Sequence, residues 1–198
     1  TVIPESVADL SGDQIRKRAG LADSQIDCVF GGAPCQGFSL TGPRKLDDKR
    51  NQLYRSVFEL VQKAEPKAFL IENVKGMATL YKGKVKEDIV KQFSSLGYNV
   101  STKILNSKNF GVPQSRERLF YIGLKDKSFN FPPPLFEEGE YVTCREALDD
   151  LPSLENLVEV YAYSSNESSD YQKLIKNASR ELKNHQPTKH TQEVISVI

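Results

Sequence analysis

The chain has 198 residues, of which 38% are hydrophobic and 27% charged, and its formal net charge at pH 7 is +1. This length and composition predict a globular protein with a sizeable buried core and exclude a mainly disordered chain. The small net charge excludes a basic field over the whole protein, so an anionic partner must be met by a local cluster of charge. The sequence has no run of 18 apolar residues and no signal-peptide pattern, so we expect no membrane partner.

The three cysteines, Cys28, Cys35 and Cys144, stand at wide and unmatched spacings. An odd number argues against a disulfide framework and favours reduced thiols in a cytosolic protein. We expect no metal site, because there is no C-x-x-C pattern and the only histidines are His185 and His190. Cys28 lies within an apolar run and is interpreted as a core residue, whereas no pattern assigns a role to Cys144.

Apolar runs alternate with amphipathic runs along the first part of the chain. Consecutive apolar residues predict buried strands, whereas apolar residues spaced three and four apart predict helices. In chain order, the predicted elements are a strand over residues 26–30, a helix over 53–64, a strand over 68–72, a helix over 85–96 and two adjacent strands over 99–105 and 118–124. This order is typical of an α/β protein in which a mostly parallel sheet carries helices on both faces.

The sequence changes in character after residue 130. Three consecutive prolines at 132–134 favour an extended connector, and Thr143 followed by Glu146 predicts the capped start of a short helix. We therefore expect a core domain over residues 1–130 and a connector with a helical segment over residues 131–198.

A glycine-rich loop, FGGAPCQGFS, follows the first predicted strand at residues 30–39. Ligands of open α/β sheets bind beyond the carboxyl ends of the strands, where both Cys35 and Glu72 are expected. A lone cysteine is more often a packed thiol than a nucleophile, but Pro34 and the flanking glycines shape a backbone that suits a nucleophile. Glu72 could equally cap a helix or pair with an arginine, because a carboxylate after a buried run needs a partner.

A second candidate cluster lies in the stretch PQSRERLF at residues 113–120. Gln114, Arg116 and Arg118 alternate, so on an extended backbone they point to one face and could organise an anionic site, with Glu117 on the other face. The alternative is an exposed edge strand.

A basic stretch, GPRKLDDKRNQ, lies between the two candidate clusters at residues 42–52. It contains Arg44 and Arg50, and it is either a solvated loop or a contact for an anionic partner.

Taken together and in this order, these features resemble the DNA cytosine-5 methyltransferases. That family carries a Pro-Pro-Cys-Gln-Gly-Phe-Ser-like loop, then Glu-Asn-Val, then Gln-x-Arg-x-Arg; this chain has APCQGFS at 33–39, ENV at 72–74 and QSRER at 114–118. The resemblance runs from about residue 9 to residue 124 and more loosely to NHQPTKHT at 184–191. It departs at Ala33, where the family usually has a second proline.

The resemblance implies a Rossmann-like methyltransferase fold with S-adenosylmethionine as cofactor. Cys35 would attack C6 of cytosine, Glu72 would contact N3 and the 4-amino group, and Arg118 would contact O2. Arg116 would steady the nucleophile loop and Glu72, and Asn73 would order the site. The remaining implied residues are Gln114 at the catalytic face, Asp9, Leu10, Pro34 and Leu53 at the cofactor, and Gln36, Ser39, Arg44 and Arg50 at the DNA backbone.

The family's Phe-x-Gly-x-Gly cofactor loop is not found in this chain. We expect that loop, with the N-terminal part of the sheet, to precede Thr1, and a target recognition region to follow Ile198. On that expectation the chain by itself is inactive.

The sequence therefore predicts a DNA cytosine-5 methyltransferase of a bacterial restriction-modification system, which flips its target base out of double-stranded DNA. The full enzyme is expected to be a monomer in the cytoplasm, at the nucleoid. One alternative is a tRNA cytosine-5 methyltransferase of the same fold, although such enzymes tend to carry Pro-Phe-Thr where this chain has Gly37-Phe38-Ser39. The others are a non-catalytic piece of a split methyltransferase or an inactive remnant, and a thiol enzyme of another class, against which the two companion motifs argue.

Overall fold

The computed structural model describes residues 2–6, 9–21, 24–32, 52–154, 162–163, 169–176 and 182–186, with the backbone alone at 52–54. The chain divides into two compact units, each described here by itself. The first unit is Thr1–Asn106 with Arg116–Pro134, and the second is Ser107–Ser115 with Leu135–Ile198. The predicted domain boundary at residue 130 stays a prediction.

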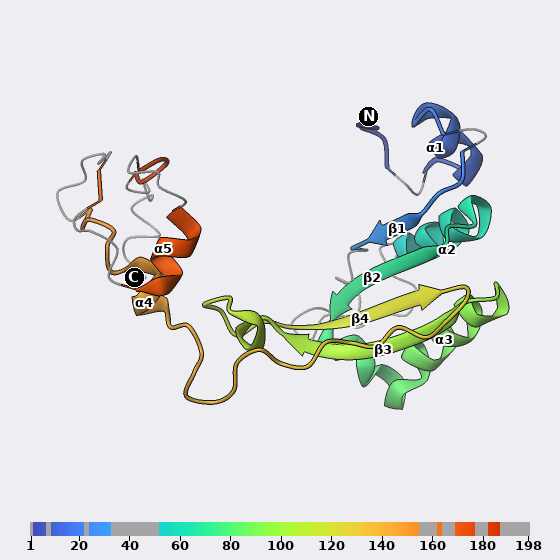
Figure 1. Ribbon diagram of the computed structural model, residues 1–198. Helices are drawn as coiled ribbons and strands as arrows, with labels where there is room; N and C mark the ends of the chain where they lie inside the picture. The colour runs from blue at the N-terminus through green and yellow to red at the C-terminus, as the bar shows by residue number, and fades with distance from the viewer. Residues whose placement is uncertain are drawn as a thin grey trace, which may run out of the picture. The chain divides into compact units, whose positions relative to one another are not determined.

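The first unit is built on a four-stranded sheet in the order β1-β2-β4-β3 (Figure 1). Strand β1 pairs with β2 in parallel, and β4 is antiparallel to both of its neighbours, so three strands run one way and β4 runs against them. The predicted α/β class is confirmed, and the two last predicted strands are adjacent. The strands are β1 (Cys28–Gly31), β2 (Ala68–Val74), β3 (Asn99–Asn106) and β4 (Glu117–Leu124).

Two long helices follow the apolar spacing from which they were predicted. They are α2 (Gln52–Ala64) and α3 (Lys84–Ser95), and the short 3-10 helices η3 (Lys75–Ala78) and η4 (Leu80–Gly83) connect β2 to α3. Helix α3 closes before Gly97, whose φ of 85° is in the left-handed region that glycine adopts readily. This glycine therefore allows the chain to leave the helix at that point.

The core lies on one face of the sheet. Phe69 and Ile71 of β2 and Leu119 and Tyr121 of β4 alternate with less buried residues, as expected for strands with one covered face. Residues of α2 and α3 complete this cluster, namely Val57, Val61, Ile89 and Phe93. In the described part of the chain α2 and α3 thus cover the same face, and helices on the other face stay a prediction.

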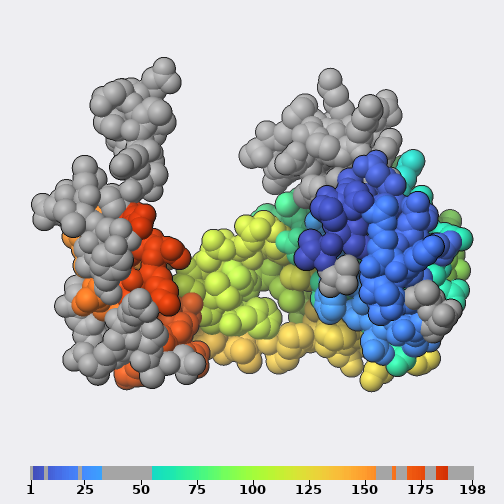
Figure 2. All heavy atoms as spheres, turned by 90° about the horizontal axis from the view of Figure 1, so that it is seen from above, coloured from blue at the N-terminus to red at the C-terminus, as the bar shows by residue number. Residues whose placement is uncertain are grey.

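Helix α1 (Gly12–Arg18) was not predicted from the sequence. The helix begins with a capping box: the Ser11 side chain accepts a hydrogen bond from the backbone N–H of Gln14, and the Gln14 side chain accepts one from the backbone N–H of Ser11. The Arg16 side chain donates to the carbonyl of Ala64 at 3.2 Å, which ties α1 to the end of α2. Figure 2 shows the N-terminal residues, in blue, packed beside the teal atoms of α2.

The second unit contains η5 (Ser107–Phe110) and two short helices, α4 (Cys144–Leu148) and α5 (Asp170–Lys176). The predicted capping box at the start of α4 is confirmed, with Thr143 and Glu146 bonded reciprocally. Helix α5 turns polar side chains inward: Gln172 is fully buried and donates to Asp149 Oδ1 at 2.6 Å. Lys176 forms a buried ion pair with Asp150 and lies 3.8 Å from the centre of the Tyr163 ring.

Helix α5 also exposes two apolar side chains. Leu174 is 78% exposed and Ile175 is 53% exposed. Among the described residues, no helix is long and apolar enough to cross a membrane.

Candidate active site

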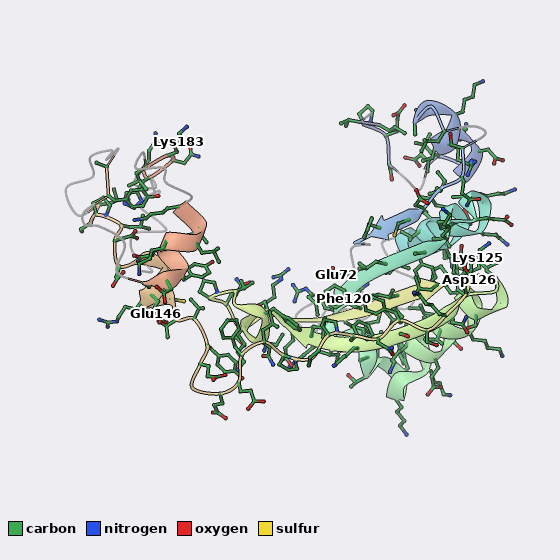
Figure 3. The ribbon with its side chains drawn as sticks, in the orientation of Figure 1. Glu72, Phe120, Lys125, Asp126, Glu146 and Lys183 are labelled. Atoms are coloured by element: carbon green, nitrogen blue, oxygen red, sulfur yellow. The ribbon has the colours of Figure 1, made fainter. Side chains whose placement is uncertain are left out.

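An ion pair joins the ends of the two central strands of the sheet. Arg118 Nε lies 2.7 Å from Glu72 Oε1, and the two side chains are 23% and 35% exposed (Figure 3 labels Glu72). Glu72 is in register with Phe120 of β4, so Arg118 is its diagonal neighbour on the same face of the sheet. The carboxylate that follows the apolar run of β2 therefore has an arginine as its partner, one of the two alternatives that the sequence left open.

The exit of β1 lies beside this pair. Gly32 follows the last residue of β1, and a Cβ atom placed on it would lie 4.0 Å from Glu72 Oε2. Parallel pairing of β1 with β2 brings both carboxyl ends to the same edge of the sheet, as the sequence predicted. The chain thus enters the glycine-rich loop next to Glu72, and Cys35 itself, with Pro34, lies outside the described residues.

Asn73 occupies the opposite face from Glu72. It is buried, and its Oδ1 accepts a hydrogen bond from the backbone N–H of Val74 at 2.8 Å. This contact orders the end of β2 just before the chain turns into η3. Its role in catalysis stays a prediction.

A second ion pair closes the same end of the β2–β4 ladder. Lys75, the first residue after β2, pairs with Glu117, the first residue of β4. Side chains alternate along β4, so Glu117 lies on the same face as the buried Leu119 and Tyr121, and Arg118 lies on the other face. The two ion pairs therefore lie on opposite faces of the sheet. The sequence predicted that Glu117 lies on the opposite face from the arginines. It did not indicate a role for Lys75, which is marked only by its position directly after the Glu-Asn-Val motif.

The Gln-x-Arg-x-Arg motif does not form one extended face. Strand β4 begins only at Glu117, and the backbone N–H of Gln114 donates to the carbonyl of Val112 at 2.7 Å in a tight turn. The expected alternation of Gln114, Arg116 and Arg118 on an extended backbone is therefore wrong at Gln114. Gln114 also belongs to the second unit, whereas both arginines belong to the first.

The Arg116 side chain is exposed, and its backbone N–H donates to Asn106 Oδ1 at 3.0 Å. Arg118 Nη1 donates to the carbonyl of Glu117 at 2.8 Å. Arg118 is thus the arginine that the structure places on Glu72, and the expected contact of Arg116 with Glu72 stays a prediction.

Two predicted cofactor residues precede α1. Asp9 is exposed, with its backbone N–H donating to the carbonyl of Ser6 at 3.0 Å, and Leu10 is half-buried. A carboxylate acceptor beside an apolar side chain fits the amino group and ring of an adenine. Leu53 is described only as backbone at the start of α2.

The predicted DNA contacts all lie outside the described residues. They are Gln36, Ser39, Arg44 and Arg50.

A cleft of about 540 Å³ lies elsewhere in the first unit. Its walls include Arg16, Lys63 and Lys67, together with Lys125 and Asp126, which Figure 3 labels. None of the predicted site residues lines it. Within the described part of the chain, no group of three or more His, Cys, Asp or Glu side chains could hold a metal ion.

The Cys28 thiol lies at the start of β1 and is only half-buried, so it is less enclosed than the predicted core residue. Burial raises the pKa of this thiol, which keeps it protonated near neutral pH. Cys28 is therefore a poor nucleophile in this structure. Cys144 is exposed, and its Sγ lies 3.4 Å from the carbonyl of Pro113.

Comparison with known proteins identifies the family. The family model described as C-5 cytosine-specific DNA methylase matches residues 5–196. The type II methyltransferase M.DdeI of Desulfomicrobium norvegicum is 38% identical over 98% of this chain and 48% of its own length. The type II methyltransferase M.BsuRI of Bacillus subtilis is 45% identical over 64% of this chain and 31% of its own. The chain thus spans about half the length, or less, of these relatives.

The fold is also found among solved structures. A structure described as a DNA modification methyltransferase encoded within a prophage (E. coli) superposes with a TM-score of 0.70 at 24% identity, over 98% of this chain and 60% of that one. The α/β fold of the chain is therefore that of a methyltransferase, as the sequence predicted. On the family model and the curated relatives together, the chain belongs to the C-5 cytosine-specific DNA methylases.

Proposed function

We propose that this chain carries the catalytic residues of an enzyme that transfers a methyl group from S-adenosylmethionine to C5 of cytosine in double-stranded DNA, within a type II restriction-modification system. The observation that supports it best is the Glu72–Arg118 pair at 2.7 Å, beside the exit of β1. A carboxyl group and a guanidinium next to the start of a cysteine loop are the groups that covalent activation of a pyrimidine needs.

The chemistry begins with C5 of cytosine, which is a poor nucleophile. Addition of the Cys35 thiolate to C6 breaks the C5=C6 double bond and places an electron pair at C5, shared with N3 and O2. S-adenosylmethionine would supply the methyl group that this electron pair attacks, with the methyl–sulfur bond breaking and S-adenosylhomocysteine as the leaving group. A base then takes the C5 proton, the double bond forms again, and the thiolate leaves C6.

Glu72 and Arg118 would stabilise the charge that develops on the ring. The Glu72 carboxyl group would contact N3 and the 4-amino group, and the Arg118 guanidinium would donate to O2. A guanidinium carries five N–H groups, so Arg118 can bind both Glu72 and the Glu117 carbonyl and still donate to the base. Because C6 is inaccessible in a stacked duplex, the target cytosine must be flipped out.

The other proposed residues would support this centre. Arg116, Asn73 and Gln114 would order the site. Asp9, Leu10, Pro34 and Leu53 would contribute to the cofactor pocket, and Gln36, Ser39, Arg44 and Arg50 would hold the DNA backbone. The full enzyme would act as a monomer in the bacterial cytoplasm, at the nucleoid.

The test is a covalent trap in the full-length protein. DNA of mixed sequence that contains 5-fluorocytosine, incubated with S-adenosylmethionine, should yield a DNA–protein adduct that survives denaturation, because the fluorine at C5 cannot leave as the proton does. Mass spectrometry should locate the adduct at Cys35. Cys35→Ser should form no adduct, and retention of methylation by this variant would overturn the mechanism.

A further inference from the structure

Asn106 closes β3 at the point where the chain returns to the sheet as β4. Its partner in the β3–β4 ladder is Glu117. Its side-chain Oδ1 accepts a hydrogen bond from the backbone N–H of Arg116 at 3.0 Å. One side chain therefore ties the residue before β4 to the last residue of β3, across the nine residues 107–115 that lie between Asn106 and Arg116.

The side chain of Arg118 depends on how the chain enters β4. Arg118 Nη1 donates to the backbone carbonyl of Glu117 at 2.8 Å, and its Nε contacts Glu72 at 2.7 Å. Side chains stand roughly perpendicular to a strand, so a shift of the backbone at Arg116 and Glu117 moves the guanidinium with it. Asn106 is opposite Glu117 in register, at the place where such a shift would begin.

We propose that Asn106 is a positioning residue for Arg118. Through the backbone N–H of Arg116 it fixes the start of β4, and it thereby fixes where the guanidinium meets the cytosine ring. The proposal rests on the proposed function, because Arg118 has a task to be positioned for only if the protein acts on cytosine. Asn106 acts through the backbone of Arg116. The atom that makes this contact is the side-chain oxygen Oδ1, which accepts the hydrogen bond.

The chain offers a matched control at the other end of the same strand. Asn99 is opposite Leu124, and its Nδ2 donates to the carbonyl of Lys125, the residue after β4, at 3.2 Å. Each asparagine thus bonds one backbone group just outside β4, and both bonds are exposed. Asn106→Ala and Asn99→Ala should lower the thermal stability of the full-length enzyme by similar amounts, so a difference in activity between them is not a difference in folding.

The kinetic test measures release of tritium from DNA of mixed sequence labelled at C5 of cytosine. We expect Asn106→Ala to lower kcat by roughly 10-fold to 100-fold with little change in KM for DNA or S-adenosylmethionine, because a misplaced catalytic group slows the reaction without weakening substrate binding. Asn106→Asp keeps an acceptor oxygen for the Arg116 N–H and should restore kcat to within about threefold. Equal kcat values for Asn106→Ala and Asn99→Ala, or loss of kcat in Asn106→Asp as large as in Asn106→Ala, would overturn the proposal.

A double variant shows whether Asn106 acts through Arg118. In an Arg118→Ala background, Asn106→Ala should cause no further loss of kcat, because coupled residues are not additive. Full additivity would contradict the proposal. Absence of tritium release from the wild-type enzyme would instead contradict the proposed function, and the two failures are thereby separate.

Discussion

Glu72 and Arg118 meet across the β2–β4 ladder two residues out of register, with 2.7 Å between the carboxylate oxygen and Nε. A parallel neighbour, β1, ends beside the same carboxylate. Both residues of the pair therefore stand on paired strands and not on a loop, which is the arrangement that positions catalytic groups most precisely.

Removal of the Arg118 guanidinium should abolish most of the activity. In the full-length enzyme we expect Arg118→Ala to lower kcat by about 100-fold or more, because one preorganised donor at a developing oxyanion is worth that much. Tritium release from C5-labelled DNA measures it. Lys67→Ala is the control, because it removes an exposed ion pair with Asp27 just before β1 and β2 begin and should leave kcat unchanged. Near-normal turnover by Arg118→Ala would remove this residue from the mechanism.

Gly123 should not tolerate a side chain. It is in register with Phe69, and a Cβ atom on Gly123 would overlap the Phe69 ring, which packs against Phe93 and Tyr98. We expect Gly123→Ala to destabilise the protein by about 1–3 kcal/mol, measured by urea denaturation. Phe69→Leu should recover part of this loss in the double variant, because it removes the overlapping ring. If the two losses simply add, the overlap is not their cause.

The stability should fall between pH 10 and pH 12 because of Tyr98. Burial, with a smaller effect of Glu65, raises the pKa of Tyr98 to about 12. The native state therefore keeps the phenol proton that the unfolded state loses near pH 10, so this contribution is complete below about pH 10 and is lost as the pH rises through about 12. Urea denaturation across this range measures it.

Tyr98→Phe is the control for that pH dependence. The variant loses the hydrogen bond of the Tyr98 hydroxyl to the carbonyl of Pro66, 2.6 Å long, and should be about 1 kcal/mol less stable at neutral pH. Its stability should fall less steeply than that of the wild type above pH 10. Parallel curves for the two proteins would show that Tyr98 does not cause the fall.

The buried ion pair of Asp150 and Lys176 should make the protein's stability sensitive to the loss of either partner. They are 2% and 6% exposed, so Lys176→Met leaves a buried carboxylate without its partner and should cost about 3–5 kcal/mol. Lys176→Met combined with Asp150→Leu should cost less than Lys176→Met alone. The control is Lys173→Ala on the same helix, which breaks an exposed pair with Asp170 and should change stability by less than about 0.5 kcal/mol.

The sequence predicted those parts of the fold that depend on local spacing. Apolar residues such as Val57 and Val61 lie one helical turn apart, so their helix is visible without any knowledge of its neighbours. Strand direction is different, because alternation of buried residues looks the same whichever way a strand runs. The direction of β4 is therefore visible only in its pairing with β2, and the turn at Gln114 only in its local backbone hydrogen bond to Val112.

For the candidate site, the sequence predicted which residues take part but not which of them are in contact. The motifs contain both Glu72 and Arg118, but which arginine meets the carboxylate depends on the register of β4 against β2. Asn106 carries no sequence signal at all, because its side chain acts on the backbone of a residue ten positions away. Helix α1 was missed although Ser11 and Gln14 form a recognisable capping box, since its seven residues are too few for a clear apolar period.

The buried polar positions of α5 affect which substitutions this helix can tolerate. Its inward positions are held by specific partners of Gln172 and Lys176, whereas Leu174 and Ile175 face outward. Within the described structure, we expect a charged replacement at Leu174 to cost less stability than an apolar replacement at Gln172, because the buried Asp149–Gln172 hydrogen bond would be lost. Hydrophobicity alone would therefore assign Gln172 to the surface and Leu174 to the interior, the reverse of where they lie.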